Sequence, residues 1–393
     1  MRGKQTYNSN KRIDFSLLEK LTIIIPTHNR NYYLSRCLEY HSQFPFMEII
    51  VADSSLPNKQ RINKKVIDNI NERNNVSIKY IWIESDNDKY GRDIVEKWDT
   101  AVKYVNTKYS LICTDKEYYI PSTLVKCIEY LESHPDTYLC EGKYCYIERP
   151  LSGKYMIRNM YPSKTPILQN DAVSRLTMAS KGKTLSCNQM GIHNSKFHKF
   201  LYNILNQNKI DDIRFGEFTL ELLTIASSKT MYLNLPYCYR DICNLSTNNT
   251  LIKNESSSLR YPYLETYQKE GIYDLYFKRF VNCLAPEISK NSALTLSEAE
   301  SFVNTELPKI IKKRGFYGNT KFTQDPLWYI WRHAPSFMKN LGGYIIPKKY
   351  LDYKEISTPE EKYITDIIEK TKHLHATDSP IDESILSEEM RLN

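Results

Sequence analysis

Two acidic residues, Asp115 and Glu117, stand two positions apart directly after the apolar run 111–113. On an extended segment these two carboxylates point the same way, while Lys116 points to the opposite face. Paired carboxylates offer the oxygen ligands that suit Mg²⁺ or Mn²⁺. The spacing therefore predicts either a divalent-metal site or a charged turn at the end of a buried strand.

Two further polar segments, 27–30 and 53–55, also follow short apolar runs, at 21–26 and 48–52. These runs, and those at 77–83 and 109–114, are typical of buried strands, and helical patterns lie at 31–42, 60–74, 92–106 and from 121 to about 133. Such alternation predicts an α/β fold with a mostly parallel sheet covered by helices on both faces. Because ligands bind at the carboxyl ends of such strands, we expect the three polar segments to share one rim.

The pattern weakens after about residue 136. We expect antiparallel edge strands within 138–147, an exposed loop at 150–170, helices at 195–207 and around 215–225, and a strand at 230–235. After about 245 the composition shifts and the chain becomes mainly helical. The predicted division is a polar lead-in at 1–20, an α/β domain at 21–245 and a helical C-terminal region at 246–393.

The composition favours a protein of the cytoplasm with an anionic partner. Of 393 residues, nine are Cys, with no CxxC pair, which indicates free thiols in a reducing compartment. No secretory signal is visible at the start, and no apolar run is long enough to cross a bilayer. The net charge of +8 is spread along the chain, which argues against nucleic acid as the partner.

Missing motifs exclude two function classes. Neither GxGxxG nor GxxxxGK[ST] follows the first strand, which argues against a dinucleotide enzyme and a P-loop NTPase. Asp53, at the end of the second strand, can accept hydrogen bonds from a ribose or a base. The alternative is an aspartate that only shapes its own turn.

Four segments carry a family resemblance: LTIIIPTHNR (21–30), EIIVADSS (48–55), the acidic cluster at 115–117 and RFGEFTLELLTIASSKTMYL (214–233). In order and spacing they resemble the landmarks "PTYNR", "VDDGS", "DxD" and "GED" of the family 2 glycosyltransferases. The resemblance covers about residues 20–245. It implies the GT-A fold, a nucleotide-diphospho-sugar-binding α/β domain.

The resemblance also implies roles for individual residues. A nucleotide-binding set comprises Pro26, Thr27, Asn29, Arg30, Asp53 and Lys97, with Arg92 a further candidate beside Lys97. Asp53 matches the acid that holds the base. Asp115 and Glu117 match the metal ligands, and a bound Mg²⁺ or Mn²⁺ would bridge the diphosphate oxygens. The alternative is a site without metal, in which Lys116 and Arg240 offset the diphosphate charge.

The last landmark departs from the family. Phe218 stands where the family has its catalytic Asp, and Glu217 comes one position earlier. Phe218 fits an apolar stripe, so we expect Glu217 to face the cleft as general base, with Asp212 and Glu221 as alternatives. Segment 184–193 matches the acceptor region, which makes Asn188, Gln189 and His193 candidate acceptor ligands.

The implied function is inverting transfer of a sugar from a nucleotide-diphosphate donor to a glycan or lipid-linked acceptor, in bacterial surface-polysaccharide assembly. One alternative is a catalytically silent GT-A module that acts as a scaffold in such an assembly. Another is a nucleotidyltransferase, which the missing glycine-rich loop disfavours. The aromatic and basic residues of 325–349 predict core packing of a helical appendage, or contact with the inner face of a membrane.

Overall fold

The computed structural model describes residues 13–46, 48–73, 76–84, 92–148, 155–159, 164–181, 188–241, 264–313 and 353–371. The first part alternates strands and helices after a short 3₁₀ turn, η1 (Phe15–Lys20): β1 (Leu21–Thr27), α1 (Asn31–His41), β2 (Glu48–Asp53), α2 (Pro57–Arg73), β3 (Ile78–Trp82), α3 (Arg92–Lys103) and β4 (Tyr109–Ile112). This alternation confirms the predicted α/β class.

The middle part of the chain adds further strands and helices to this layout. They are β5 (Glu117–Tyr119), α4 (Pro121–Ser133), β6 (Thr137–Glu148), β7 (Met156–Asn159), α5 (Ala172–Lys181), η2 (Asn188–Met190), β8 (Ile192–Asn194), α6 (Ser195–Gln207), α7 (Ile213–Ser227) and β9 (Lys229–Asp241). The last described elements are α9 (Leu264–Lys269), α10 (Tyr273–Lys290), α11 (Leu296–Lys313), β10 (Tyr353–Glu355) and α14 (Pro359–Thr371).

Within the described residues the strands form one mixed sheet, in the order β10-β7-β6-β8-β4-β1-β2-β3, with β9 pairing to β6 and β5. Strands β3, β2, β1 and β4 are parallel. Strand β8 runs antiparallel to β4, so the direction changes beside β4. The carboxyl ends of β1, β2 and β4 therefore meet at one rim, as the sequence predicts.

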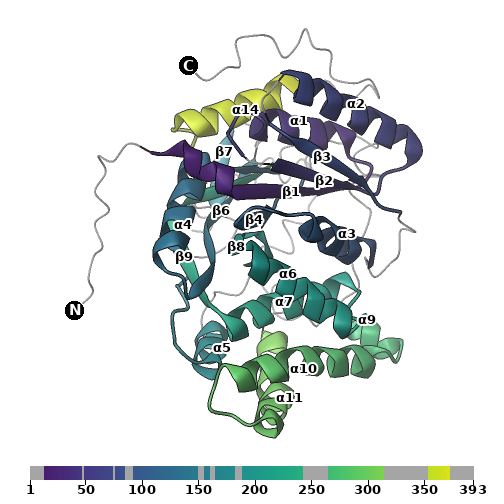
Figure 1. Ribbon diagram of the computed structural model, residues 1–393, viewed down its shortest axis with the longest axis vertical. Coiled ribbons are helices and arrows are strands. Elements are labelled where there is room, and N and C mark those ends of the chain that lie inside the picture. Colours follow the sequence, from purple (N-terminus) through teal and green to yellow (C-terminus); the bar gives the residue numbers. More distant parts are fainter. Residues whose placement is uncertain are drawn as a thin grey trace, which may run out of the picture.

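Both faces of the parallel strands are buried, which is why their sequences are apolar without alternation. Ile23 and Ile25 of β1 pack in the core beneath α1, α2 and α4. Ile24 points to the other face and packs with α3, α6, α7 and α10. Figure 1 shows these two helical layers on opposite sides of β1–β3. All three isoleucines are 0% exposed, and each such burial contributes about 1.5–3 kcal/mol.

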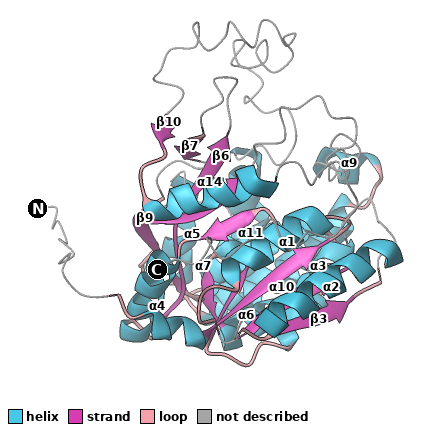
Figure 2. Cartoon of the chain, turned by 90° about the horizontal axis from the view of Figure 1, so that it is seen from above, coloured by secondary structure: helices cyan, strands magenta, loops and turns pink. Residues whose placement is uncertain are grey.

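The region after residue 264 shares the cores of the preceding elements. Helix α10 joins the core that contains α7, through Phe280 stacked on Phe218. Strand β10 pairs with β7, and α14 packs its Ile364 and Ile367 against Tyr40 of α1. Figures 1 and 2 show α14 at the α1 side of the sheet. The segment 325–349 lies outside the described residues. Among those residues, no helix has the length and apolarity to cross a membrane.

Three local predictions were wrong. Part of the expected exposed loop at 150–170 is strand β7, which pairs with β6 and buries Ile157. Strand β6 is correspondingly not an edge strand, because β7, β8 and β9 all pair with it. Residues 115–116 form a turn rather than an extended segment, closed by the bond from Glu117 N to Thr114 O of 3.0 Å.

Candidate functional site

The loops that follow β1 and β2 are joined into one unit at the rim. Ser54 N donates to Thr27 O at 3.2 Å, and Asn29 N donates to Ser55 Oγ at 2.7 Å. Asn29 Oδ1 accepts from Leu56 N at 2.9 Å. Asn29 has φ 54°, in the left-handed region that asparagine tolerates better than most residues. The rim is thus held by bonds between loops that are distant in sequence.

Asp53 lies under this rim rather than on it. Its carboxylate is 0% exposed and accepts hydrogen bonds from Ser55 N (2.7 Å), Asn63 Nδ2 (2.8 Å) and Tyr80 Oη (2.8 Å). The bond to Ser55, two residues on, is that of an aspartate shaping its own turn. The geometry therefore fits an aspartate that shapes its own turn, and the expected contact of Asp53 with a base stays a prediction.

Lys97 of α3 also lies under the rim and supports its loops through hydrogen bonds. Its side chain is 2% exposed, and Nζ donates to Ser54 Oγ at 2.7 Å and to Thr27 O at 3.4 Å. A nucleotide on the rim would meet the loops that Lys97 supports, and the positive charge lies directly beneath them. Pro26 belongs to β1, one residue before the rim. The side chain of Arg92 lies outside the described residues.

Asp115 connects the acidic turn to the loop after β1. Thr27 Oγ1 donates to Asp115 Oδ2 at 3.0 Å, and Arg30 Nη1 lies 3.3 Å from Asp115 Oδ1. Asp115 is the main cause of a raised pKa for the Arg30 guanidinium. The predicted meeting of segments 27–30 and 115–117 therefore occurs through these contacts.

Glu117 begins β5 and stands opposite Arg240 of β9 in the antiparallel register. Its Oε2 accepts from Thr114 N at 2.9 Å. Its Oε1 has no hydrogen bond among the described residues, and Arg240 Nη1 lies 3.8 Å away. Burial raises the pKa of the Glu117 carboxyl, and the charge of Arg240 partly opposes that rise.

Lys116, between the two acids, turns toward α1. Its Nζ lies 3.9 Å from the centre of the Tyr33 ring, a cation–π contact. Burial and then the charge of Arg30 lower the pKa of Lys116 to about 8, with Arg240 acting in the same direction. Three cations from three segments therefore surround the two acids of the turn.

The acids do not fit a divalent metal in this arrangement. The side chains of Asp115 and Glu117 are 2% and 1% exposed, whereas those of Arg30 and Arg240 are each 33% exposed. The guanidinium groups therefore lie on the solvent side of the carboxylates. Both oxygens of Asp115 already face protein donors, and a metal at Glu117 would meet the charge of Arg240.

Glu217 lies in the first turns of α7, beside η2. Gln189 Nε2 donates to Glu217 Oε1 at 3.2 Å. Burial raises the pKa of Glu217, while the charges of Arg214 and Arg240 and the bond from Gln189 lower it. The interaction with Arg240 means that Glu217 and the acidic turn belong to one charged region. The adjacent Phe218 is 3% exposed and packs in the core, as predicted.

The approach of α7 to α3 depends on Gly216. A Cβ at Gly216 would lie 3.2 Å from Val95 Cγ2, closer than most real contacts, so a side chain there would require Val95 to shift by a few tenths of an ångström. The helix that carries Glu217 is thereby held close to the helix that carries Lys97. Local sequence alone does not reveal this requirement.

The two alternatives to Glu217 as general base, Asp212 and Glu221, are both buried side chains. Asp212 is the N-cap of α7, where its Oδ1 accepts from Phe215 N at 2.9 Å and from Tyr267 Oη at 2.6 Å. It is 0% exposed, and burial raises its pKa to about 6. Glu221 is also buried, one turn beyond Glu217. Glu217 is more exposed than either.

The acceptor candidates separate in the structure. Gln189 reaches Glu217, as described above. His193 does not lie at the rim: it pairs in β8 with Ser110 at the start of β4, is 1% exposed and stacks on His198 at 4.3 Å. Burial lowers the pKa of His193 to about 4. It is a core histidine, and its expected role in acceptor binding stays a prediction. The side chain of Asn188 lies outside the described residues.

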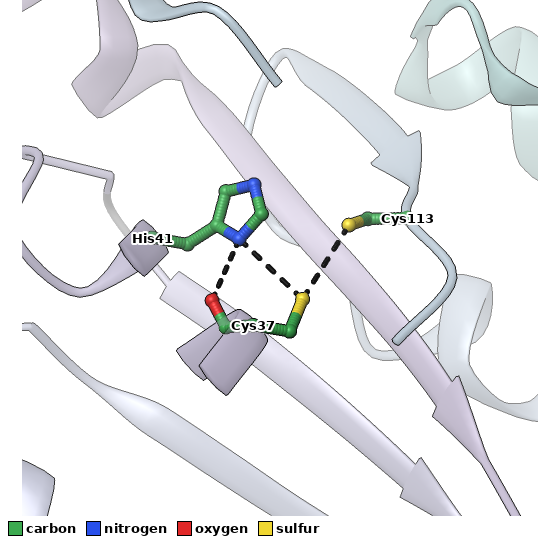
Figure 3. Close-up of side chains that lie close together, drawn as sticks. All are labelled: Cys37, His41 and Cys113. Carbon is green, nitrogen blue, oxygen red and sulfur yellow. Dashed lines mark hydrogen bonds between the residues drawn. The ribbon is translucent and has the colours of Figure 1, made fainter. Parts of the chain in front are cut away.

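A cluster that sequence reasoning missed lies on α1 and after β4 (Figure 3). Cys37 Sγ is 3.8 Å from Cys113 Sγ and 3.5 Å from His41 Nδ1. His41 Nδ1 must carry a proton, because it lies 2.8 Å from the carbonyl oxygen of Cys37, and Tyr119 N approaches Nε2 at 3.4 Å. Burial raises the pKa of Cys37, but Cys113 and His41 outweigh it and lower the pKa to about 6.

This cluster is the group of three potential metal ligands found within the described residues, and all three are buried. With both ring nitrogens of His41 engaged, the arrangement serves packing beneath the acidic turn rather than metal binding. Its signal in the sequence is the four-residue spacing of Cys37 and His41 on one helix face. Nothing in the sequence pairs them with Cys113.

Neither a protein-family model nor a curated protein matches the chain. Among solved structures, residues 1–349 of S. aureus TarS, in complex with UDP or UDP-GlcNAc, are similar at 15% and 16% identity with a TM-score of 0.45, covering 91% of each chain. The mannosyltransferase PcManGT from Pyrobaculum calidifontis, in complex with GDP-Man and Mn²⁺, is similar at 10% identity with a TM-score of 0.38, over 92% of this chain and 88% of that one. Similarity this low assigns neither a family nor an activity.

Proposed function

We propose that the chain is an inverting glycosyltransferase of the GT-A fold and of the family 2 type, which uses a nucleotide-diphosphate sugar. The observation that carries this proposal is the convergence at one rim. Arg30, after β1, lies near Asp115, Arg240 of β9 lies near Glu117, and Lys116 lies in the turn between these two acids. A carboxylate suited to act as a base, Glu217, interacts with the charge of Arg240.

The proposed reaction has one group-transfer step. The oxygen of an acceptor hydroxyl attacks the anomeric carbon of the sugar, forming a new C–O bond as the bond from that carbon to the diphosphate oxygen breaks. Glu217 takes the hydroxyl proton, and the electron pair of the broken bond leaves with the nucleoside diphosphate. Attack from the side opposite the leaving group inverts the anomeric carbon.

The surroundings of Glu217 suit this role. One oxygen accepts from Gln189 at 3.2 Å, which orients the carboxylate. Burial raises its pKa, which makes it a stronger base than an exposed glutamate. The acceptor would be a glycan or a lipid-linked glycan, presented from the η2 side at the cytoplasmic face of the membrane.

A nucleotide panel tests the proposal. The full chain is titrated with UDP, GDP, CDP and CMP, with and without Mn²⁺, while its unfolding temperature and heat of binding are followed. We expect at least one nucleoside diphosphate to stabilise the fold through binding to the native state. If no nucleotide binds under any of these conditions, the proposal fails.

A silent binding module is the second candidate. The observation that favours it is that both acids of the turn are buried behind arginines rather than open to a metal. Such a module would bind a nucleoside diphosphate without consuming a donor sugar. Release of nucleoside diphosphate from a panel of nucleotide sugars, with glycan acceptors present, distinguishes an enzyme from the module.

A further inference from the structure

We propose that Arg30, Lys116 and Arg240 form a cation clamp that neutralises the donor diphosphate directly, so that this chain needs no divalent metal. The inference rests on the proposed function and replaces the expected metal site at Asp115 and Glu117. It names the groups that meet the leaving diphosphate.

The first argument is the order of charges from solvent to core. The side chains of Arg30 and Arg240 are each 33% exposed, over carboxylates that are 2% and 1% exposed. An anion arriving from solvent therefore meets guanidinium groups before it meets an acid. A metal ion would have to displace both arginines to reach its ligands.

The second argument is the looseness of the two ion pairs. Arg30 Nη1 lies 3.3 Å from Asp115 Oδ1, and Arg240 Nη1 lies 3.8 Å from Glu117 Oε1. A strong charge-assisted bond between such groups measures about 2.7–2.9 Å. Neither the contact to Asp115 nor the contact to Glu117 is a tight pair that a phosphate would have to break.

The third argument is the position of the remaining cation. Lys116 lies in the turn between the two acids, and its Nζ lies 3.9 Å from the centre of the Tyr33 ring on α1. Cations from three segments therefore adjoin this turn, and such a group of cations favours a polyanion. The turn is fixed in place by the bond from Asp241 N to Lys116 O at 2.9 Å.

In the transfer step the clamp acts on the breaking bond. As the bond from the anomeric carbon to the diphosphate oxygen breaks, negative charge grows on that oxygen. Fixed cations near it stabilise that charge more in the transition state than in the ground state. No other reactant is needed, because the acceptor proton goes to Glu217.

The first test measures binding of UDP, GDP and CDP to the full chain by calorimetry, in excess EDTA and then with Mn²⁺ or Mg²⁺. We expect the same affinity in both conditions. Binding that appears only with a divalent ion overturns the clamp and leaves the proposed function standing. Absence of nucleotide binding in all conditions overturns the proposed function as well.

The second test removes one cation of the clamp at a time. Arg240→Gln and Lys116→Gln should each weaken diphosphate binding roughly 10- to 100-fold, because hydrogen bonds to charged groups are the strong ones. Arg279→Gln, on α10, is the matched control, because its guanidinium bonds Lys209 O away from the rim. Unaltered binding in both rim variants overturns the clamp.

Glu117→Gln separates the clamp from a metal site most sharply. The clamp predicts equal or tighter diphosphate binding, because the substitution removes a negative charge beside Arg240 and nearly preserves the shape. A metal site predicts weaker binding, since a ligand is lost. In the double variant Glu117→Gln with Arg240→Gln, both members of the pair are neutral. If it binds the diphosphate more weakly than Glu117→Gln alone, the difference measures the contribution of the Arg240 charge to binding.

Discussion

Two arginines lie near the carboxyl end of β9 and have different surroundings. Arg240 is 33% exposed and 3.8 Å from Glu117. Arg36, from α1, is 0% exposed and lies 2.7 Å from Asp241, with its guanidinium carbon 4.4 Å and 5.0 Å from the rings of Tyr32 and Tyr33. Both ion pairs join an arginine to a carboxylate. They differ in the distance between the charged atoms and in the burial of the arginine.

The difference separates a structural ion pair from cations that a ligand can use. Arg240 and Asp241 are neighbours on β9, and successive residues of a strand point to opposite faces. The strand thus directs one charge to the rim and the next into the interior. Removing one partner of a buried pair costs far more stability than disturbing an exposed pair.

Among substitutions at the rim, Glu217→Gln should have the largest effect on turnover. Loss of the base should lower turnover by roughly 10²–10⁴-fold, with nucleotide binding retained. Steady-state transfer kinetics and calorimetry on the same preparation measure both quantities. Unchanged turnover would assign the base elsewhere.

The pH dependence of the wild type sharpens this prediction. Burial raises the pKa of Glu217, and the base must be ionised to accept a proton. Activity should therefore fall as the pH drops through a value above that of an ordinary glutamate. In Glu217→Gln the residual activity should lack this acid limb.

Arg36→Met should give the largest effect on stability. It removes the guanidinium that lies 2.7 Å from the buried Asp241 carboxylate, and breaking a buried pair in this way costs about 3–5 kcal/mol of unfolding free energy. Denaturant titration measures this loss. The double variant Arg36→Met with Asp241→Leu should recover most of it, because no charge then remains buried. A single variant as stable as the wild type would show that this pair is not structural.

Asp212→Asn tests a buried carboxylate whose hydrogen-bond donors are a tyrosine and a backbone N–H. Because the folded-state pKa is raised to about 6, the stabilising contribution is present at low pH and is lost as the pH rises through 6. Between about pH 4 and 7 the variant should gain on the order of 2–3 kcal/mol relative to the wild type. Denaturant titrations across this range measure the difference, and a difference independent of pH would contradict the prediction.

Arg240→Gln should have the smallest effect on stability. Glu117 is buried, but its pair with Arg240 is long, the arginine is partly exposed and the carboxyl can take up a proton instead, so we expect a smaller loss than for Arg36→Met. The unfolding transition of this variant should lie between those of Arg36→Met and the wild type. A loss as large as that of Arg36→Met would remove the distinction between the two arginines.

Much of the fold was predictable from local patterns. The β-branched run of β1 and the stripe of α1 predict their elements to within about a residue. Strand β7 was not predictable in this way, because its four residues are stabilised by pairing with β6 and β10. Strand β6 ends at Glu148, close before β7, but β10 begins only at Tyr353, so the pairing on that side leaves no local signal.

The sequence predicted which segments meet at the site, but it did not predict which way their side chains point. Sequence reasoning brings Arg30 and Asp115 to one rim, because parallel strands end together. It does not reveal that Asp53 points inward to Tyr80 and Asn63, since those partners come from β3 and α2. The burial of His193 was not predictable for the same reason, because His193 stacks on His198 of α6.

The sequence by itself determined which elements form and which polar segments end the parallel strands, because period and turn chemistry are local. Only the tertiary structure decided the roles of the charges. Whether Asp115 and Glu117 are open to a metal or covered by arginines depends on how the loop after β1 and the end of β9 pack around the turn. Contacts of this kind join residues 85 or more positions apart, and burial, which sets the strength of each charge, exists only after folding.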